Sequence, residues 1–314
     1  RTQLDGEEVR RSYSICTGVN DGELRVAVKR VAGGRFSAYA NDVLKAGHVL
    51  EVMPPSGHFH VPLDPARHGN YLAVAAGSGI TPILSIIKTT LESEPHSRVT
   101  LLYGNRSSNA ALFREQLEDL KNRYLDRLNL IFVFSREQQD VDLYNGRIDA
   151  DKCAQLFSRW LDVKALDAAF VCGPQAMTET VCGSLKANGM PAESIHFELF
   201  AAVGSQQKRE ARQTTAQADS AMSQITVISD GRELAFELAR NSVSVLDAGN
   251  AQGAELPYSC KAGVCSTCKC KVIAGEVEMD SNFALEDYEV AAGYVLSCQA
   301  FPLSDKVVLD FDQL

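Results

Sequence analysis

Residues 260–268 have the sequence CKAGVCSTC, and this cysteine-rich stretch dictates how the end of the chain folds. It contains three of the nine cysteines, Cys260, Cys265 and Cys268, and a fourth, Cys298, follows 30 residues later. Clustered cysteines outside a secreted protein indicate metal binding more often than disulfides. The arrangement therefore predicts a site at which a tight loop and one distant residue supply four thiolates to metal.

The spacing of these cysteines, C-x4-C-x2-C with a distant fourth, is that of the plant-type [2Fe–2S] centre. Such a centre needs four thiolates on two irons, and Gly263 lets the loop backbone bend close to inorganic sulfide. Zinc ribbons instead use two separate C-x2-C pairs, which this loop does not offer. The spacing favours an iron–sulfur cluster over structural zinc or inert buried thiols. We assign four other cysteines to core packing: Cys16, Cys153, Cys182 and Cys270.

The composition is that of a globular protein, with 314 residues, 45% hydrophobic and 23% charged. At roughly 150 residues per domain, this length predicts two or three domains. No uncharged apolar run approaches the ~18 residues of a membrane span, and the opening RTQLDGEEVR does not resemble a signal peptide. Nine cysteines without a secretory signal indicate a reducing compartment. We expect a soluble cytoplasmic protein with no membrane partner.

The net charge of −9 is concentrated at the end of the chain. Residues 224–314 contain 14 acidic and 6 basic side chains, whereas the preceding residues are almost neutral. Phosphates would repel such an acidic module, so we expect no nucleic-acid partner. Two interpretations stay open: the charge serves solubility, or it docks the module onto a basic protein face.

Apolar runs alternate with helical patterns between residues 71 and 200. Continuous apolar strands separated by helices predict a parallel sheet covered on both faces. We therefore predict a doubly wound α/β domain at residues 67–200. Its expected strands are 71–76, 98–104, 128–134, 167–173 and 194–200, and its expected helices are 82–92, 110–124 and 174–188.

The sequence on either side of this domain has a different character. Residues 201–223 are polar with few large aliphatic side chains, which predicts an interdomain linker. Residues 224–314 predict a small α+β domain, with a hairpin around Asp230-Gly231, a helix at 245–249 and a strand at 306–311.

Residues 1–66 predict strands at 23–31 and 48–53 and a helix at 37–44. Two or three strands are too few for a stable sheet with its own core. The chain also lacks an initiator Met. We expect half of a β-barrel whose beginning is missing, with a segment that leans on its neighbour as the alternative.

Three stretches carry a specific resemblance: residues 71–95 (YLAVAAGSGITPILSIIKTTLESEP), 101–124 (LLYGNRSSNAALFREQLEDLKNRY) and 256–312 around the cysteines. They resemble the reductase subunits of phenylacetyl-CoA epoxidases, in the ferredoxin-NADP reductase superfamily, and the resemblance extends through almost the whole chain. It implies an FAD-binding barrel at 1–66, an NADP-binding domain at 67–200 and a plant-type ferredoxin domain at 224–314.

The nicotinamide nucleotide is expected at the carboxyl ends of the parallel strands. There the GSGITP turn lets the backbone approach a pyrophosphate at a helix N-terminus, although such glycines also form plain tight turns. The resemblance implies that Cys172 lies beside the nicotinamide ring without acting as a nucleophile, and that Thr81 contacts both cofactors. It also matches Glu198 and Phe200 to an acidic and aromatic pair near the ring stack, although Phe200 is alternatively a core residue. The candidate residues are Gly77, Gly79, Thr81, Pro82, Cys172, Gly173, Pro174, Met177, Glu198 and Phe200.

The flavin signature of the superfamily, R-x-Y-S, matches residues 11–14. The resemblance implies that Arg11 pairs with a flavin phosphate, Tyr13 packs on the isoalloxazine ring and Ser14 hydrogen-bonds near N5. A second phosphate loop (Gly34, Phe36, Ser37) favours FAD over FMN, and an adenine-side strand (Val28, Lys29, Arg30) is alternatively a solvated edge. The superfamily has roughly three barrel strands before this signature, where the chain has only about ten residues.

The choice between NADPH and NADH depends on a site for the 2′-phosphate. Arg106 follows the second strand where NAD enzymes have an acidic residue, and Ser135-Arg136 follows the third. Ser-Arg at this position resembles the 2′-phosphate site of plant ferredoxin-NADP reductases, which Tyr144 and Arg147 would complete. We predict NADPH.

The three modules together predict an electron-transfer enzyme. A hydride carries two electrons and a [2Fe–2S] cluster accepts one, so the flavin must stand between them. By resemblance, the protein partner is the diiron oxygenase component that epoxidises phenylacetyl-CoA in phenylacetate breakdown. The alternatives are another oxygenase (a Rieske dioxygenase or steroid hydroxylase), an iron–sulfur redox sensor, and a zinc-stabilised interaction domain fused to a dehydrogenase.

Overall fold

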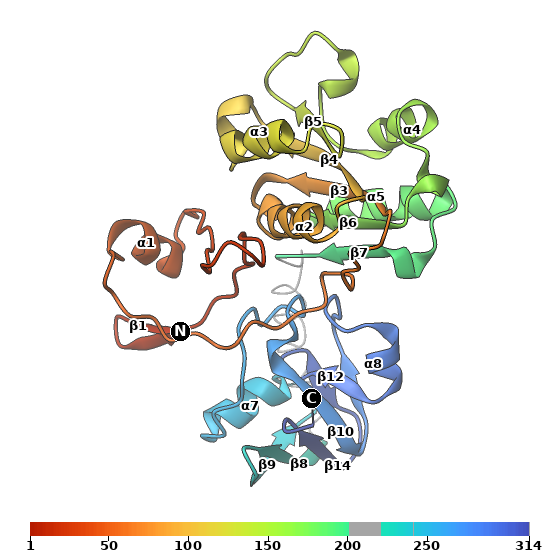
Figure 1. Ribbon diagram of the computed structural model, residues 1–314. Helices are drawn as coiled ribbons and strands as arrows, with labels where there is room; N and C mark the ends of the chain where they lie inside the picture. The colour runs from red at the N-terminus through yellow and green to blue at the C-terminus, as the bar shows by residue number, and fades with distance from the viewer. Residues whose placement is uncertain (201–220, 241, 314) are drawn as a thin grey trace. The chain divides into compact units, whose positions relative to one another are not determined.

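The computed structural model describes residues 1–200, 221–240 and 242–313, which form two compact units (Figure 1). One unit comprises residues 13–44 and 58–200. The other comprises residues 1–12 and 45–57 together with the described residues from 221 onward. Each unit has hydrophobic core clusters of its own.

The first unit is built on a parallel sheet of five strands in the order β5-β4-β3-β6-β7. The chain runs outward from the central strand β3 to one edge and then returns to build the other. This order is that of a doubly wound α/β fold, and it confirms the predicted fold class. The strands are β3 (Asn70–Ala76), β4 (Arg98–Asn105), β5 (Leu128–Phe134), β6 (Ala168–Cys172) and β7 (Ile195–Glu198).

The central strand β3 has no charged residue and is buried from Tyr71 to Ala75, because helices cover both of its faces. Tyr71 and Ala73 pack into one core with helices α2 and α3, whereas Leu72 and Val74 pack into a second core with α4 and α5. The helices therefore cover both faces of the sheet (Figure 1). They are α2 (Ile80–Ser93), α3 (Arg114–Arg123), α4 (Ala150–Arg159) and α5 (Gln175–Ala187).

Two helices of this unit differ from the sequence predictions. Helix α4 was not predicted, although Cys153, Leu156 and Phe157 are spaced for one buried face, and the Asp149 side chain accepts a hydrogen bond from Lys152 N–H as its N-cap. Helix α3 begins at residue 114 rather than 110, because Phe113 before it has a left-handed backbone. Short 3₁₀ turns occupy Gly77–Gly79, Ser108–Ala110, Asp142–Tyr144, Val163–Ala165 and Ala192–Ser194.

The segment before the parallel sheet contains helix α1 (Arg35–Asp42), close to its predicted place. The predicted strands at 23–31 and 48–53 are wrong: the first makes only one isolated bridge, between Ile15 and Val26, and the second has no strand pairing. An extended backbone forms a strand only when a neighbour completes its hydrogen bonds. An unpredicted hairpin joins β1 (Thr2–Leu4) to β2 (Glu7–Val9).

The second unit contains a five-stranded sheet in the order β12-β10-β14-β8-β9. The predicted hairpin is confirmed: β8 pairs antiparallel with β9, and Asp230 and Gly231 both have positive φ, as a tight I′-like turn requires. Strand β14 pairs parallel with β8. The five strands are β8 (Met222–Ser229), β9 (Arg232–Ala239), β10 (Lys269–Ala274), β12 (Tyr294–Leu296) and β14 (Lys306–Asp310). A separate antiparallel pair joins β11 (Val277–Met279) to β13 (Ala300–Pro302).

Two short helices accompany this sheet, α7 (Val245–Ala251) and α8 (Asp287–Ala291). A 3₁₀ turn at Ser266–Cys268 leads from the cysteine loop into β10. Of the predicted linker, residues 201–220 lie outside the described residues, and residues 222–223 already belong to β8.

Candidate functional site

The four cysteines of the motif form two close pairs in the second unit. The Sγ atoms of Cys260 and Cys265 are 3.1 Å apart, and Cys268 is hydrogen-bonded to Cys298. The hydrogen bond within the first pair lowers the pKa of Cys265 to about 5 and raises the pKa of Cys260. Cys268 and Cys298 are buried, whereas Cys260 and Cys265 are half-buried. The four cysteines of the motif therefore lie close together in space.

The shape of the cysteine loop is fixed by its backbone conformation and backbone hydrogen bonds. Gly263 has φ +73°, and a Cβ atom there would lie 2.6 Å from the carbonyl oxygen of Ser281. Phe283 N–H donates to the Gly263 carbonyl at 2.9 Å, and Ala262 N–H donates to Cys260 Sγ at 3.3 Å. Backbone donors aimed at sulfur stabilise a thiolate, which is the ligand form of cysteine.

The cysteines of the motif lie as two pairs, Cys260 with Cys265 and Cys268 with Cys298. A tetrahedral zinc site needs its ligands around one centre, whereas a [2Fe–2S] cluster takes two thiolates on each of two irons. The donor set therefore fits the cluster. Cys270 is fully buried in the neighbouring core, and its Sγ lies 3.8 Å from the Val295 carbonyl, as packing predicts.

The other packing cysteines lie in the α/β unit. Cys16 and Cys153 are buried, and Cys182 is half-buried against the core beneath α5. Burial raises the pKa of the Cys182 thiol to about 11 and also raises the pKa of Cys153. These thiols are therefore protonated and unreactive at neutral pH.

Three predicted residues meet at the carboxyl edge of the parallel sheet. Cys172 ends β6 and pairs in register with Glu198 at the end of β7. Ser14 Oγ donates a hydrogen bond to Glu198 Oε2 at 2.7 Å, across 184 residues of sequence. Burial, with a smaller contribution from the Glu198 charge, raises the pKa of Cys172 well above its usual value. Cys172 is thus a neutral thiol, which agrees with the expectation that it is no nucleophile. Phe200, two residues past β7, is 43% exposed, so it is not a core residue.

The two glycines of the turn between β3 and α2 lie in different surroundings. A Cβ atom on Gly79 would lie 2.1 Å from the Cys172 carbonyl oxygen, so this glycine permits close packing of β6. Gly77 has φ +56° and open space where a side chain would stand. The Thr81 hydroxyl, at the start of α2, donates to the Ser78 carbonyl at 3.0 Å. The tight-turn interpretation suits Gly79, whereas Gly77 leaves a cradle that fits a nucleotide phosphate.

The next turn of this edge, at the end of β6, is equally compact. A Cβ atom on Gly173 would lie 2.5 Å from Met177 Cε, and Pro174 is the N-cap of α5. Gly173, Pro174 and Met177 therefore pack together beside Cys172. Pro82 is buried in the first turn of α2.

The candidate 2′-phosphate residues are brought together at the ends of β4 and β5. Arg136 N–H donates to the Arg106 carbonyl at 2.8 Å, and Ser135 N–H donates to the Asn105 carbonyl at 3.0 Å. The side chains of Arg106, Ser135 and Arg136 are exposed. Glu137, beside them, accepts hydrogen bonds from the backbone and hydroxyl of Ser108. Two arginines and a hydroxyl thus share one exposed corner. Arg147 is exposed and Tyr144 is half-buried.

The aromatic residues of the flavin motifs form a cluster in the first unit. The ring centroids of Tyr13 and Phe36 are 5.6 Å apart, and those of Phe36 and Tyr39 are 6.2 Å apart. Aromatic faces of this kind fit an isoalloxazine or adenine ring.

The phosphate loop of the flavin segment is less open than predicted. The Ser37 hydroxyl is buried, accepts from Val31 N–H at 3.1 Å and donates to the Gly34 carbonyl at 3.1 Å. It therefore rigidifies the loop. Arg11 is exposed and its guanidinium donates to the Arg10 carbonyl. Val28, Lys29 and Arg30 lie on irregular backbone, where Arg30 pairs with Asp42.

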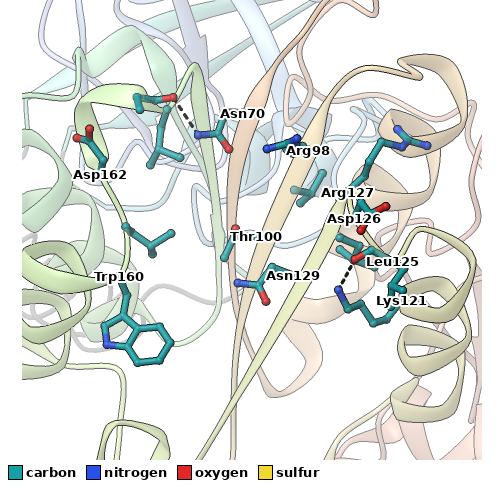
Figure 2. A pocket seen from close by; sticks show the side chains of 15 residues that line it. Asn70, Arg98, Thr100, Lys121, Leu125, Asp126, Arg127, Asn129, Trp160 and Asp162 are labelled. Atoms are coloured by element: carbon teal, nitrogen blue, oxygen red, sulfur yellow. Dashed lines mark hydrogen bonds between the residues drawn. The ribbon is translucent and has the colours of Figure 1, made fainter.

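A cavity of about 300 Å³ lies elsewhere on the same unit, at the amino ends of the strands (Figure 2). Asn70, Arg98 and Asn129 line one part of it, and Trp160 and Asp162 line another. Open α/β sheets bind ligands at the carboxyl ends of their strands. None of the predicted site residues lines this cavity, so it is not the nucleotide site.

Comparison with known proteins agrees with this arrangement. Three family models match successive parts of the chain: an oxidoreductase FAD-binding domain at residues 1–61, an oxidoreductase NAD-binding domain at 73–183 and a 2Fe-2S iron-sulfur cluster binding domain at 227–303. The chain is 50% identical to one of the subunits of the 1,2-phenylacetyl-CoA epoxidase of Escherichia coli K12, over 99% of this chain and 86% of the relative. The chain belongs to the ferredoxin-NADP reductase superfamily.

Other relatives of this superfamily member also serve oxygenases. It is 31% identical to the ferredoxin reductase component of a 3-ketosteroid-9-alpha-monooxygenase of Rhodococcus rhodochrous, over 96% of this chain and 83% of the relative. It is 30% identical to a glycine betaine monooxygenase reductase subunit of Pseudomonas aeruginosa UCBPP-PA14, over 98% of this chain and 84% of the relative. The chain is thus an NAD(P)H-dependent flavin and iron–sulfur oxidoreductase that passes electrons to an oxygenase.

Solved structures support the same fold. Phthalate dioxygenase reductase matches with a TM-score of 0.55 and 26% identity, over 96% of this chain and 83% of that one. A self-sufficient cytochrome P450 monooxygenase matches 96% of this chain with 35% of its own, at a TM-score of 0.68 and 23% identity. Within the described residues, no helix combines the length and hydrophobicity needed to span a bilayer.

Proposed function

We propose that this reductase delivers electrons from NADPH to the diiron oxygenase component of a phenylacetyl-CoA epoxidase. The observation that carries the choice of partner is the identity to the E. coli epoxidase protein, 50%, against 31% and 30% for the steroid and glycine betaine reductases. When bound, FAD takes a hydride from the nicotinamide and releases single electrons to the [2Fe–2S] cluster.

The cysteine pairs supply the ligands of the cluster. Cys260 and Cys265 would hold one iron of the cluster, and Cys268 and Cys298 would hold the other. The 3.1 Å approach within the first pair and the hydrogen bond within the second support this division. The Ala262 N–H donates to Cys260 Sγ and would stabilise the negative charge on this sulfur when it binds iron as a thiolate.

The edge formed by Ser14, Cys172 and Glu198 receives the stacked nicotinamide and flavin rings. Glu198 fixes the Ser14 hydroxyl through the 2.7 Å hydrogen bond, so that this hydroxyl points in one direction. Cys172 keeps its proton and presents a small neutral surface to the ring. Gly77 cradles the pyrophosphate, and Phe200 supplies an aromatic face. Orientation of this kind is the main contribution a protein makes to hydride transfer.

NADPH is favoured over NADH by the corner at Arg106, Ser135 and Arg136. Two exposed guanidinium groups joined through their backbone form a site of the charge and geometry that a phosphate monoester prefers. Glu137, the acidic residue nearest in sequence, already accepts two hydrogen bonds from Ser108.

These assignments correspond to a flavin domain at 1–66, a nucleotide domain at 67–200 and a ferredoxin domain from 224 onward. The second includes the complete parallel sheet, and the third includes nearly all of the mixed sheet formed by β8, β9, β10, β12 and β14.

The partner is tested with purified oxygenase components. The full-length reductase is mixed with the phenylacetyl-CoA epoxidase oxygenase or, as a matched control, with the oxygenase of a 3-ketosteroid 9α-monooxygenase. We expect NADPH to drive rapid reduction of the epoxidase oxygenase, with formation of its product. We expect the steroid oxygenase to be reduced much more slowly. Equal reduction of both, or faster reduction of the steroid oxygenase, would refute the proposed partner.

A further inference from the structure

One lysine beside the proposed cluster site has its charge balanced by a buried carboxylate. Lys269 follows Cys268 directly, and its Nζ lies 3.1 Å from Glu289 Oε1. The two side chains are 16% and 4% exposed. The ring of Tyr294 lies 5.0 Å from the same ammonium group. Water therefore screens these two charges poorly, so either charge without its partner would act over a longer range than a surface charge does.

Both carboxylate oxygens of Glu289 are engaged. Oε2 accepts from the backbone N–H of Glu286 at 3.0 Å, which completes the capping box of α8. Oε1 is the partner of Lys269. The same carboxylate therefore ties α8 to β10, the strand that leads away from the cysteine loop. The Cys268 carbonyl is fixed in turn by the backbone N–H and the hydroxyl of Ser297, each at 3.0 Å.

A second lysine offers a comparison within the same unit. Lys261 follows Cys260, and its Nζ lies 2.6 Å from Asp247 Oδ1. These side chains are 35% and 33% exposed, so water screens this pair more strongly. Lys261 and Lys269 each follow a cysteine of the motif, and each pairs with a carboxylate from a helix. Only the pair of Lys269 with Glu289 is buried.

The consequence of this balance concerns the electron that the cluster accepts. A cluster gains one negative charge on reduction, so an unbalanced cation nearby favours the reduced form. Lys269 directly follows the proposed ligand Cys268, and the buried ion pair with Glu289 fixes its ammonium group. We propose that Glu289 is a positioning residue that neutralises Lys269 and thereby keeps the reduction potential of the cluster low. This inference rests on the proposed assignment of the four cysteines to a [2Fe–2S] cluster.

The test is a redox titration of the full-length holoprotein, followed by the electron paramagnetic resonance signal of the reduced cluster. Glu289→Gln keeps an oxygen that accepts from Glu286 N–H but removes the charge. We expect it to raise the reduction potential of the cluster. At a fixed ambient potential, the ratio of reduced to oxidised cluster should increase roughly tenfold, which corresponds to a shift of ~59 mV for a one-electron couple. An unchanged potential with an intact signal overturns the proposal.

Two further variants keep the test decisive if Glu289→Gln folds poorly. Lys269→Gln removes the positive charge beside Cys268 and is expected to lower the potential; an unchanged or raised value overturns the proposal. Asp247→Asn, at the exposed pair, is expected to shift the potential less than Glu289→Gln, and an equal shift contradicts the role of burial. If the wild-type protein contains no cluster signal, the failure lies in the cluster assignment itself and not in the role of Glu289.

Discussion

A backbone hydrogen bond joins Arg106 and Arg136. Arg136 N–H donates to the Arg106 carbonyl, so the ends of two neighbouring parallel strands hold these two exposed residues side by side. A charge-assisted hydrogen bond contributes about 1.5–3 kcal/mol, which corresponds to roughly a 10- to 100-fold change in binding. We predict that Arg136→Ala raises the KM for NADPH by about this factor and leaves the KM for NADH almost unchanged.

Steady-state kinetics with both nucleotides checks this prediction, and Arg98 provides the control. Arg98 is also exposed on the α/β unit, but it lies at the amino end of β4, beside the cavity in Figure 2. Arg98→Ala should change neither KM. Equal losses for NADPH and NADH in Arg136→Ala would remove the case for a 2′-phosphate site.

A second prediction concerns Cys265 as a proposed ligand of the cluster. Cys265 is half-buried and has a pKa lowered to about 5 by its hydrogen bond with Cys260, so it is ready to ligate as a thiolate. Cys265→Ser should abolish the iron–sulfur absorption and cytochrome c reduction that depends on the cluster, yet spare flavin reduction by NADPH. Stopped-flow spectra at the flavin and iron–sulfur bands measure both steps.

The control for that experiment is Cys182→Ser. This thiol is also half-buried, but burial raises its pKa to about 11 and it belongs to the core beneath α5. We expect normal spectra and normal transfer. Full oxygenase coupling in Cys265→Ser would contradict its assignment as a ligand.

At the scale of elements, Gly79 sets the distance between two of them. Its missing Cβ allows the turn before α2 to lie against the end of β6, where a methyl group would come within 2.1 Å of the Cys172 carbonyl oxygen. Because backbone is on both sides of this contact, Gly79→Ala must push the two strand ends apart. We predict a loss of roughly 1–3 kcal/mol in unfolding free energy and weaker nucleotide binding.

Gly183 in α5 is the matched control, because it is exposed and an added Cβ would contact nothing within 4 Å. Gly183→Ala should stabilise the protein by about 0.5–1 kcal/mol, since alanine is the better helix former. Chemical denaturation measures both variants. Equal stability of Gly79→Ala and the wild type would show that the turn can relax.

An ion pair anchors the chain after the flavin motif to helix α2. Asp21 pairs with Lys88, whose side chain is 10% exposed, and also accepts from Gly18 N–H at 2.9 Å. The hydrogen bond to Lys88 is the main cause that lowers the pKa of Asp21 below its ordinary value. A carboxyl group with a lowered folded-state pKa stabilises the protein above its unfolded pKa, and this contribution disappears as the pH falls through the folded value.

We therefore predict that Asp21→Asn lowers the unfolding free energy by about 1–3 kcal/mol at neutral pH. The difference from the wild type should shrink below about pH 4, the ordinary range of an aspartate. Thermal melts from pH 3 to 7 measure it. Asp42→Asn removes an exposed ion pair with Arg30 and should have little effect at any pH. A constant difference for Asp21→Asn down to pH 3 would rule out this ion pair as its cause.

The elements also show what the sequence could and could not predict. The strands of the parallel sheet follow from their apolar runs, because burial on both faces leaves no polar alternation. Helix α4 was predictable from the spacing of Cys153, Leu156 and Phe157. Residues 23–31 have strand composition but no strand partner, and pairing is a tertiary property that no local pattern contains. The hydrogen bond between Ser14 and Glu198 joins distant residues, and only the family resemblance placed them at one site.

At the scale of the whole molecule, charge is divided unevenly between the modules. Residues 224–314 carry 14 acidic and 6 basic side chains, whereas the preceding residues carry almost no net charge. The electron acceptor must approach the module that holds the cysteine site, because electrons leave from there. If this negative field guides the oxygenase, association should depend on ionic strength, since the Debye length falls from about 10 Å at 0.1 M salt to about 3 Å at 1 M.

We predict that the rate of oxygenase reduction falls at least severalfold as salt rises from 0.05 to 0.5 M, while flavin reduction by NADPH declines less. Stopped-flow mixing of pre-reduced protein with the oxygenase isolates the first step, and mixing with NADPH isolates the second. NADPH is itself anionic, so NADH serves as the less charged donor in the control.

Substituting exposed acids of the ferredoxin module, such as Glu233→Gln and Glu237→Gln on the edge strand β9, should weaken the salt dependence without altering the cluster spectrum. A reduction rate that does not change with salt would mean that the acidic surface serves solubility alone.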